Sequence, residues 1–366
     1  MSRKRVILFG PLPPPFGGVS IFMRALCAKA IEKGAHVWSY TGKPNDENAD
    51  NPLFVNHRRF AHLLALLRYG FQARITDSTH FHFEYPNILM LPLWICAKFV
   101  LRFHWIKILH DGSLPSRYKS FSSLKRLLFQ LAVRHINEYI VVNKELETWL
   151  RETVKVSKKI FFIPSLLPLP ENWDETNLSE ELALTLERHC NHKRRVCTIG
   201  IFIPSYGFHQ VADSVERLRQ ATNEDIGLLI VDGGYERDEK YMADVLKERK
   251  WIAVAANVPH SNLATVFRKS DVFVRGFSDE SFGLSRIEAM WCDTPVIATD
   301  VGETRGMLIY KFGDISALCL HLQAVFDGKP ASDAKVWAEK FIKETEENLT
   351  NYLRVIVGDN NKTNVE

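Results

Sequence analysis

Short hydrophobic runs alternate along the chain with longer amphipathic stretches. The first run is residues 5–9, a loop rich in proline and glycine follows at 10–18, and apolar residues then recur at helical spacing over 19–33. Gly34 ends this pattern, and residues 35–40 form the next hydrophobic run. The order strand, loop, helix, strand is typical of a parallel sheet, because parallel strands need a long crossover connection.

The same alternation continues in two series. The later strand-like runs of the first half are 80–85, 106–110, 138–142 and 159–164. The second half begins again with further runs at 196–203, 226–234, 251–256, 271–276 and 294–299. We therefore predict an α/β chain with two parallel sheets and a long amphipathic helix over 333–357.

Prolines and acidic residues mark a boundary near the middle of the chain. Three prolines precede the acidic stretch NWDETNLSEE: Pro164, Pro168 and Pro170. This composition is typical of a linker, and it divides the chain into an N-terminal domain, a linker region and a C-terminal domain: residues 1–170, 171–194 and 195–332. Two parallel-sheet domains of similar size predict a ligand cleft at the carboxyl ends of their strands.

Composition excludes several classes of protein. Of the 366 residues, 46% are hydrophobic and 25% are charged, which is ordinary for a globular chain. The six cysteines form no C-x-x-C pair, so we expect no zinc site and a reducing compartment. The apolar run at 6–9 is too short for a signal peptide, and the one at 88–97 is shorter than the about 20 residues of a membrane span. We expect a cytoplasmic protein.

Charge is unevenly distributed between the two halves. Residues 1–170 hold 24 Lys and Arg against 11 Asp and Glu, a net charge of +13, whereas the rest of the chain carries −9. Many of these cations stand among aliphatic and aromatic residues, in 57–74, 98–107 and 119–135. Basic amphipathic helices can lie on an anionic membrane surface, or they can simply turn a solvated face outward. No nucleic-acid-binding motif is present, so we expect no nucleic-acid partner.

The strongest candidate for chemistry is the stretch Asp279–Met290, DESFGLSRIEAM, which follows the run DVFVRG and opens a helix. Gly283 lets the backbone approach a ligand closely, and the N–H groups at a helix start suit a diphosphate. Glu288, about one turn into the helix, can accept hydrogen bonds from two adjacent ribose hydroxyls. The alternative is that Glu280 and Glu288 only complement the helix dipole.

These residues resemble the E-x-F-G-x-x-x-x-E motif of the GT4 glycosyltransferases, which are retaining enzymes of GT-B fold. Further stretches similar to that family are PFGGVSIFMRALCAKAIEKGAHVWSYTG, ILHDGS, YIVVNKELETWL, KIFFIPS and the block DVFVRGFSDESFGLSRIEAMWCDTPVIATDVG. The resemblance implies two Rossmann-like β/α/β domains facing a central cleft, with the helix 333–357 joining the first domain. The overall pattern is similar to enzymes that build bacterial O-antigen and capsule polysaccharides.

The resemblance also assigns roles to single residues. Glu288 would hold the donor ribose, and Glu280 would face the transferred sugar near its C3. His110 would line the cleft near the sugar, although a strand-end histidine can equally be satisfied by the backbone. The remaining donor contacts would come from loop positions: Gly17 and Gly18 over the diphosphate, and Phe282, Gly283 and Leu284 against sugar and phosphate.

One departure from the family concerns the diphosphate. Relatives usually carry an arginine and a lysine at the start of the second domain, where this chain has Ile201 and Tyr206. Stabilisation of the leaving group must then come from elsewhere. Arg275 and Arg305, on loops beside the motif, are our candidates.

No Asp-x-Asp sequence occurs in the chain, which suits a metal-independent site without a cofactor. His80, His82 and Glu84 alternate on one predicted strand, where they are either a polar strand end or a metal site.

We therefore expect a retaining, metal-independent glycosyltransferase. It would move a sugar from a UDP- or GDP-sugar to a hydroxyl of a saccharide, plausibly one linked to polyprenyl diphosphate, at the inner face of the plasma membrane. The alternatives are a non-catalytic protein that binds nucleotide or lipid, a nucleotide-sugar epimerase of the same fold, and a purely electrostatic binder of membranes or nucleic acid.

Overall fold

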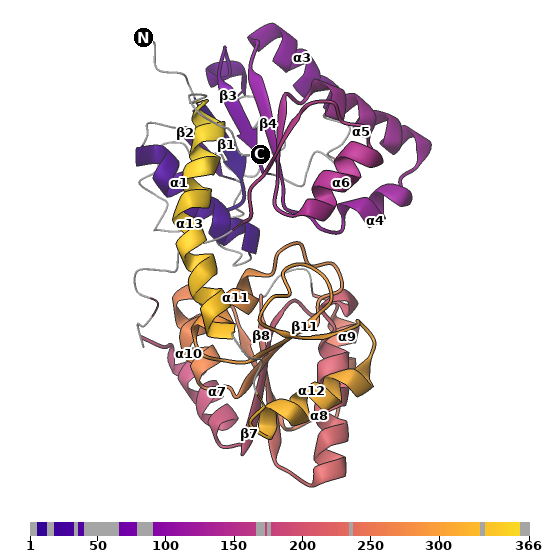
Figure 1. Cartoon of the computed structure of the whole chain (residues 1–366), viewed down its shortest axis with the longest axis vertical. Coiled ribbons are helices and arrows are strands. Elements are labelled where there is room, and N and C mark those ends of the chain that lie inside the picture. The colour runs from indigo at the N-terminus through magenta and orange to yellow at the C-terminus, as the bar shows by residue number, and fades with distance from the viewer. Residues whose placement is uncertain are drawn as a thin grey trace. The chain divides into compact units, whose positions relative to one another are not determined.

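The computed structural model describes residues 6–12, 18–32, 36–39, 66–78, 91–165, 173, 177–233, 237–329 and 334–358. The chain divides into two compact units. The first comprises Met1–Pro14, Val19–Leu167 and Thr345–Glu366, and the second comprises Pro15–Gly18 and Pro168–Glu344. Within each unit, helices lie on both sides of a sheet (Figure 1).

The first unit is built on a six-stranded parallel sheet with the order β2-β1-β3-β4-β5-β6. Its strands are β1 Val6–Gly10, β2 His36–Ser39, β3 Arg74–Asp77, β4 His104–Leu109, β5 Glu138–Val141 and β6 Lys159–Phe162. Its helices are α1 Gly18–Glu32, α3 Leu91–Leu101, α4 Leu114–Lys119, α5 Ser123–His135 and α6 Lys144–Glu152. Every predicted run of this half is thus confirmed as a strand except 80–85, which lies outside the described residues.

Two of the basic stretches, 57–74 and 98–107, do not form single helices. In 57–74 the described helix ends before Gly70, and Arg74 already begins β3, a strand that the sequence did not reveal. Its four residues are too few to show a period, although β1 and β4 pair with it on both sides. The stretch 98–107 likewise divides into the end of α3 and the start of β4, with Arg102 between them at a left-handed φ of 54°.

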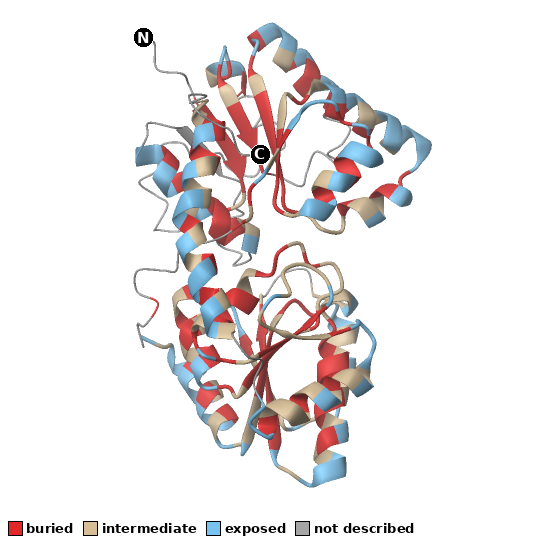
Figure 2. Cartoon of the chain, in the orientation of Figure 1, coloured by how far each residue is buried: buried red, intermediate tan, exposed pale blue. Residues whose placement is uncertain are grey.

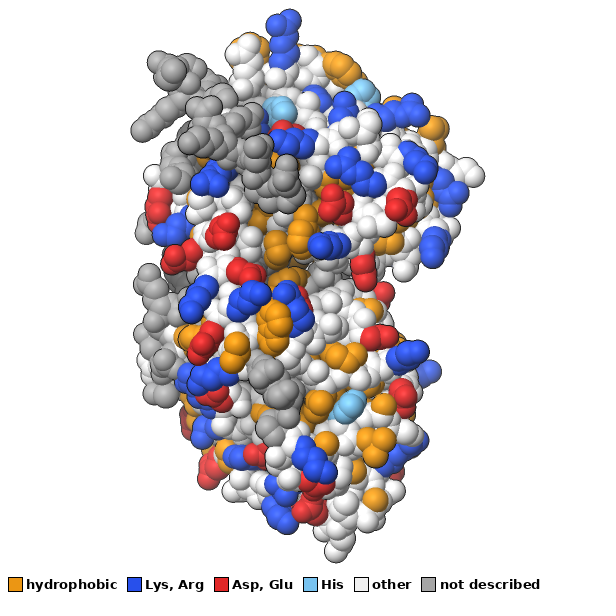
Figure 3. Space-filling model, in the orientation of Figure 1, with side chains coloured by type: hydrophobic (Ala, Val, Ile, Leu, Met, Phe, Trp, Pro, Cys, Tyr) orange, Lys and Arg blue, Asp and Glu red, His pale blue; other side chains and the backbone are white. Residues whose placement is uncertain are grey.

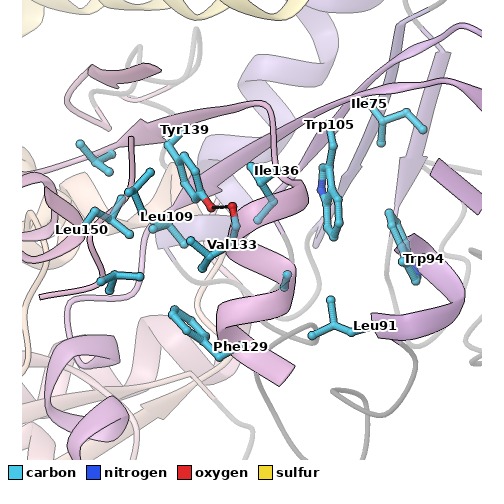
Figure 4. Close-up of a cluster of buried hydrophobic side chains, with 14 of the residues drawn as sticks. Ile75, Leu91, Trp94, Trp105, Leu109, Phe129, Val133, Ile136, Tyr139 and Leu150 are labelled. Atoms are coloured by element: carbon cyan, nitrogen blue, oxygen red, sulfur yellow. Dashed lines mark hydrogen bonds between the residues drawn. The ribbon is translucent and has the colours of Figure 1, made fainter. Parts of the chain in front are cut away.

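One core joins the first sheet to α3, α5 and α6 (Figure 4). Trp94 of α3 packs against Trp105 of β4, with ring centroids 5.4 Å apart. Phe129 of α5 lies in the same cluster. The buried hydroxyl of Tyr139 donates to the carbonyl oxygen of Val133 at 3.0 Å, so a polar group in this core is satisfied rather than left unpaired.

The second unit has its own six-stranded parallel sheet, with the order β12-β11-β10-β7-β8-β9. Its strands are β7 Arg194–Gly200, β8 Ile226–Asp232, β9 Ile252–Ala256, β10 Val272–Arg275, β11 Val296–Thr299 and β12 Leu308–Tyr310. Its helices are α7 Glu180–Cys190, α8 Phe208–Thr222, α9 Glu239–Leu246, α10 Leu263–Arg268, α11 Leu284–Trp291 and α12 Ile315–Phe326. The predicted runs are strands, and only the three-residue edge strand β12 was missed. The predicted α/β class with two Rossmann-like units is confirmed.

The predicted C-terminal helix is α13, Ala334–Val357, and the division between the units falls inside it. In the first unit, Arg74 donates to the carbonyl oxygens of Ile356 and Val355 at 2.9 and 2.8 Å. The Tyr352 hydroxyl donates to the carbonyl oxygen of Ile163 at 2.7 Å. None of the helices in the described ranges is both long and apolar enough to cross a membrane.

Candidate functional site

The motif lies where the sequence places it, on the loop between β10 and α11. β10 is an inner strand, between β7 and β11, so this loop leaves the carboxyl edge of the second sheet, where parallel sheets bind ligands. Gly283 is the N-cap residue of α11 with φ 88°. A Cβ at this position would lie 2.8 Å from Cδ of Arg286. Any other residue would therefore strain the turn that starts the helix.

Glu288 is buried one turn into α11 and has a specific partner. Its Oε1 lies 2.6 Å from Nε2 of His260, and the two side chains are 9% and 7% exposed. The ring of Trp173 packs edge-on against His260, with centroids 5.3 Å apart. The sequence did not point to His260, because it lies 28 residues before Glu288 and belongs to no motif. The hydrogen bond between His260 and Oε1 fixes the orientation of the Glu288 carboxylate. The position of the second oxygen, Oε2, is thereby fixed as well.

Glu280, the first glutamate of the motif, is an ion-pair partner. Its Oε2 accepts from Nε of Arg275 at 2.7 Å, and both side chains are nearly buried. Burial by itself raises the pKa of Glu280, but the positive charges of Arg275 and Arg286 outweigh it and hold the pKa below its usual range. Glu280 is therefore a carboxylate at neutral pH.

Tyr206 forms part of a cation-aromatic cluster. Its ring stacks on Phe277 at 4.3 Å, and the guanidinium carbon of Arg275 lies 5.0 Å from the Tyr206 ring centroid. Gly200 accommodates this ring, since a Cβ there would lie 2.0 Å from Cδ1 of Tyr206. Arg275 also donates to the carbonyl oxygen of Ile199 at 2.6 Å. Arg275 is thus already held by a carboxylate, a carbonyl and two rings.

The other two arginines near the motif differ in exposure. Arg286 is fully buried and donates to the carbonyl oxygens of Val301 and Glu303 at 2.6 and 2.9 Å, so it braces the loop after β11. Burial lowers its pKa to about 10. Arg305 is 45% exposed and pairs with Glu303 at 2.6 Å, and its guanidinium carbon lies 4.7 Å from the ring of Trp337. Arg305 is the more accessible of the two to a ligand.

The remaining predicted residues are distributed over the chain. His110 follows β4 in the first unit, and its Nδ1 lies 3.1 Å from the hydroxyl of Ser165. Phe282 is buried and Leu284 begins α11. Gly18 begins α1, whereas Gly17, His80, His82 and Glu84 lie outside the described residues. Ile201, which departs from the family pattern, is buried just beyond the end of β7.

Ligation of a metal would need several donors in one place. Among the described residues, no group of three or more His, Cys, Asp or Glu side chains is arranged to hold a metal ion. The charged groups around the motif are instead paired with one another, as in Arg275 with Glu280 and His260 with Glu288.

Comparison with known proteins adds to this picture. Residues 187–313 match the family described as glycosyl transferases group 1. The trehalose synthase of Thermococcus litoralis is 31% identical over 168 residues, which are 43% of this chain and 40% of that protein. The aligned part thus spans less than half of that relative.

Solved structures share the fold over nearly the whole chain. Sucrose-phosphate synthase from Thermosynechococcus elongatus matches with a TM-score of 0.65 and 19% identity over 97% of each chain. HepE from Anabaena, solved with UDP and glucose, matches with a TM-score of 0.70 and 16% identity over 94% of this chain and 99% of its own. The chain therefore has the GT-B fold, and its residues 187–313, which contain the motif, form a glycosyl transferases group 1 domain.

Proposed function

We propose that the chain is a retaining glycosyltransferase of the GT4 type, which transfers a sugar from a nucleotide-diphosphate sugar to a saccharide hydroxyl. The observation that carries this proposal is the buried Glu288–His260 pair, one turn into the helix that the glycine turn of the motif begins. A buried carboxylate oriented in this way suits two adjacent hydroxyls of a ribose, whose hydrogen bonds to a charged group contribute about 1.5–3 kcal/mol each.

The donor and the acceptor are part of the proposal. HepE is described with UDP-glucose, which favours a UDP-sugar, with a GDP-sugar as the other choice. The acceptor is a saccharide linked to polyprenyl diphosphate, in the biosynthesis of a bacterial surface polysaccharide such as O-antigen or capsule. A lipid-linked acceptor places the protein in the cytoplasm, at the inner face of the plasma membrane, and the net charge of +13 over residues 1–170 supports this location.

The chemistry follows from positioning and charge. The acceptor oxygen attacks the anomeric carbon on the face that the diphosphate leaves, the bond from that carbon to the phosphate oxygen breaks, and the departing phosphate takes the acceptor proton. No metal is required for this step. Glu288 holds the ribose, Glu280 accepts from hydroxyls of the transferred sugar, and Arg275 and Arg305 offset the charge of the diphosphate. His110 contributes near the sugar.

Thermal stabilisation by UDP, GDP, ADP and TDP without metal tests the nucleotide site. A nucleotide at 100 times its dissociation constant should stabilise the wild type by about 2.7 kcal/mol. Glu288→Gln should abolish this shift, whereas Glu187→Gln, at an exposed position on α7, should keep it. An undiminished shift in Glu288→Gln would remove the ribose role. Activity that disappears with EDTA would remove metal independence.

A second candidate is a protein that binds the nucleotide without turnover. It is favoured by Ile201 and Tyr206 and by the binding of Arg275 to Glu280, which together leave the diphosphate fewer cations than in relatives. The two candidates differ in products: release of nucleoside diphosphate that requires a saccharide acceptor supports the transferase. Nucleotide binding without release, over a panel of UDP- and GDP-sugars and acceptors, would support the second candidate. Conversion of the donor sugar without acceptor would instead indicate an epimerase.

A further inference from the structure

Helices α3 and α5 each carry an apolar stripe on the outside of the molecule. On α5 the stripe is Leu124, Leu127 and Leu131, which are 61%, 65% and 36% exposed. On α3 it is Leu93, Cys96 and Val100, with Leu93 and Val100 exposed by 45% and 72%. Both sets have the spacing i, i+3, i+7, so each lies along one face of its helix. Exposed ribbon marks these outward sides in Figure 2.

The two stripes belong to one surface. The opposite sides of both helices pack into the same core, through Trp94 of α3 and Phe129 of α5. At the carboxyl ends, Lys98 donates to the carbonyl oxygen of His135, and the ring of Phe99, itself 64% exposed, lies 5.3 Å from the His135 ring. We name this surface the α3–α5 face: Leu93, Cys96, Phe99, Val100, Leu124, Leu127 and Leu131, with the exposed cations Arg102 and Arg134.

The charge around the stripes is almost entirely positive. Residues 91–135 contain eight Lys and Arg and a single acidic residue, Asp111. Asp111 pairs with Arg117, and Lys107 is buried against Asp77. The other cations are Lys98, Arg102, Lys119, Lys125, Arg126 and Arg134. Helical spacing places Arg134 at one edge of the leucine stripe, and Lys and Arg side chains gather over this part of the unit in Figure 3.

We propose that the α3–α5 face docks on the surface of an anionic lipid bilayer. Leucine, valine and phenylalanine side chains would enter the boundary between headgroups and acyl chains, and the flanking cations would meet lipid phosphates. The second unit offers no such surface among its described residues, because its exposed large hydrophobics are single: Leu184, Phe312, Leu320 and Val336. The proposal extends the membrane location given above, and its test does not depend on the donor site.

Charge decides between a bilayer and the other occupants of an apolar face. A second copy of the chain would bring two strongly positive faces together, and like charges disfavour such contact. A nucleic acid would satisfy the cations but would leave the apolar stripes in water. An anionic bilayer surface satisfies both features at once.

Vesicle sedimentation tests the face directly. The full chain should sediment with vesicles of phosphatidylglycerol and phosphatidylcholine in equal parts, and much less with phosphatidylcholine alone. Val100→Glu combined with Leu127→Glu should lower the partition coefficient about tenfold or more. The matched control, Leu184→Glu with Leu320→Glu, places the same substitutions at exposed positions of the second unit and should bind as the wild type does.

The electrostatic part has its own variant. Arg102→Gln with Arg134→Gln should weaken binding about thirtyfold at low salt, since each cation near an anionic surface contributes about 1 kcal/mol. Lys247→Gln with Lys250→Gln, exposed on the second unit, should have no effect. Thermal stabilisation by nucleotide should be unchanged in all four variants, which separates loss of docking from failure of the donor site.

Several outcomes would overturn the docking proposal. One is equal binding to neutral and anionic vesicles, and another is equal binding by the face variants and their controls. A concentration-dependent dimer in light scattering that Val100→Glu with Leu127→Glu abolishes would assign the face to a second copy instead. Binding of duplex DNA that the cation variant loses, without vesicle binding by the wild type, would assign it to nucleic acid.

Discussion

The two units have the same architecture but differ in how many large hydrophobic side chains they expose. Among the described residues, ten large hydrophobics are exposed in the first unit and four in the second. Those of the first are Ile31, Leu67, Phe71, Leu93, Phe99, Val100, Leu124, Leu127, Leu131 and Phe162. Six of the ten belong to α3 and α5. The same parallel-sheet scaffold therefore presents an apolar, basic face in one unit that it lacks in the other.

Several charges of the second unit are held in partly exposed ion pairs. Arg195 pairs with Asp271 at 2.6 Å and Arg249 with Asp213 at 2.6 Å. Around the motif Arg275 also forms an ion pair, with Glu280. Paired charges fix the positions of loops, whereas unpaired surface charge attracts a partner of opposite sign. The first unit also contains ion pairs, such as Lys107 with Asp77, so the two units differ in the apolar, basic face of α3 and α5 and not in charge pairing as such.

The largest predicted effect concerns the buried ion pair of the first unit. Lys107 and Asp77 lie on neighbouring strands, 2.9 Å apart, with side chains 1% and 0% exposed. Asp77→Asn leaves a buried ammonium without its carboxylate and should lower the free energy of unfolding by about 3–5 kcal/mol. Urea unfolding measures the loss, and hydrogen exchange should place it in β3 and β4. Asp293→Asn removes a solvent-exposed partner of Lys335 and should cost less than about 1 kcal/mol. Equal effects would contradict the internal role of the first pair.

A smaller effect is expected in the second unit on acidification. His189 is buried on α7 with Nε2 3.1 Å from the hydroxyl of Ser270. Burial, helped by the charges of His192 and Arg195, lowers its pKa to about 4. Below the unfolded-state pKa of about 6.5, His189 is protonated in the unfolded chain but stays neutral in the folded chain. The free energy of unfolding therefore falls as pH decreases from 6.5 to 4, by up to about 3 kcal/mol.

His189→Gln should flatten this pH dependence when the free energy of unfolding is measured at several pH values. His321→Gln, at a half-buried position on α12, should retain it. Protection factors for hydrogen exchange should fall with acid in the strands of the second unit and not in those of the first. An unchanged slope in His189→Gln would assign the pH dependence to other groups.

The smallest predicted effect is confined to the motif. Gly283→Ala combines a φ of 88° with a Cβ 2.8 Å from Arg286, and should destabilise the second unit by about 1–2 kcal/mol while weakening nucleotide binding. Gly328→Ala, at a φ of 77° with no atom within 4 Å of the added Cβ, keeps the strain without the contact. It should cost less and leave nucleotide binding intact. Equal losses in both variants would mean that the contact with Arg286 has no consequence.

Much of the fold was predictable from local pattern. Long hydrophobic runs such as 226–234 became inner strands, and the helical spacing over 333–357 became α13. The prediction was wrong where elements are short or meet without a loop. β3 has four residues and β12 has three, so neither shows a period, and their strand conformation comes from hydrogen bonds to neighbouring strands. At Arg102 a non-glycine residue makes the left-handed turn that separates α3 from β4.

Three properties can be read from the order of residues alone: the class of the fold, the place of the motif on a strand–loop–helix turn, and the excess of positive charge in the first half. These properties depend on residues close together in the chain. Three other properties appear only in the folded chain: His260 contacts Glu288, Arg275 is held by Glu280 and Tyr206, and the leucines of α5 face outward. Each of these depends on which side chains from distant segments approach one another within a few ångströms. Tertiary packing determines these contacts, and the local sequence pattern contains no information about them.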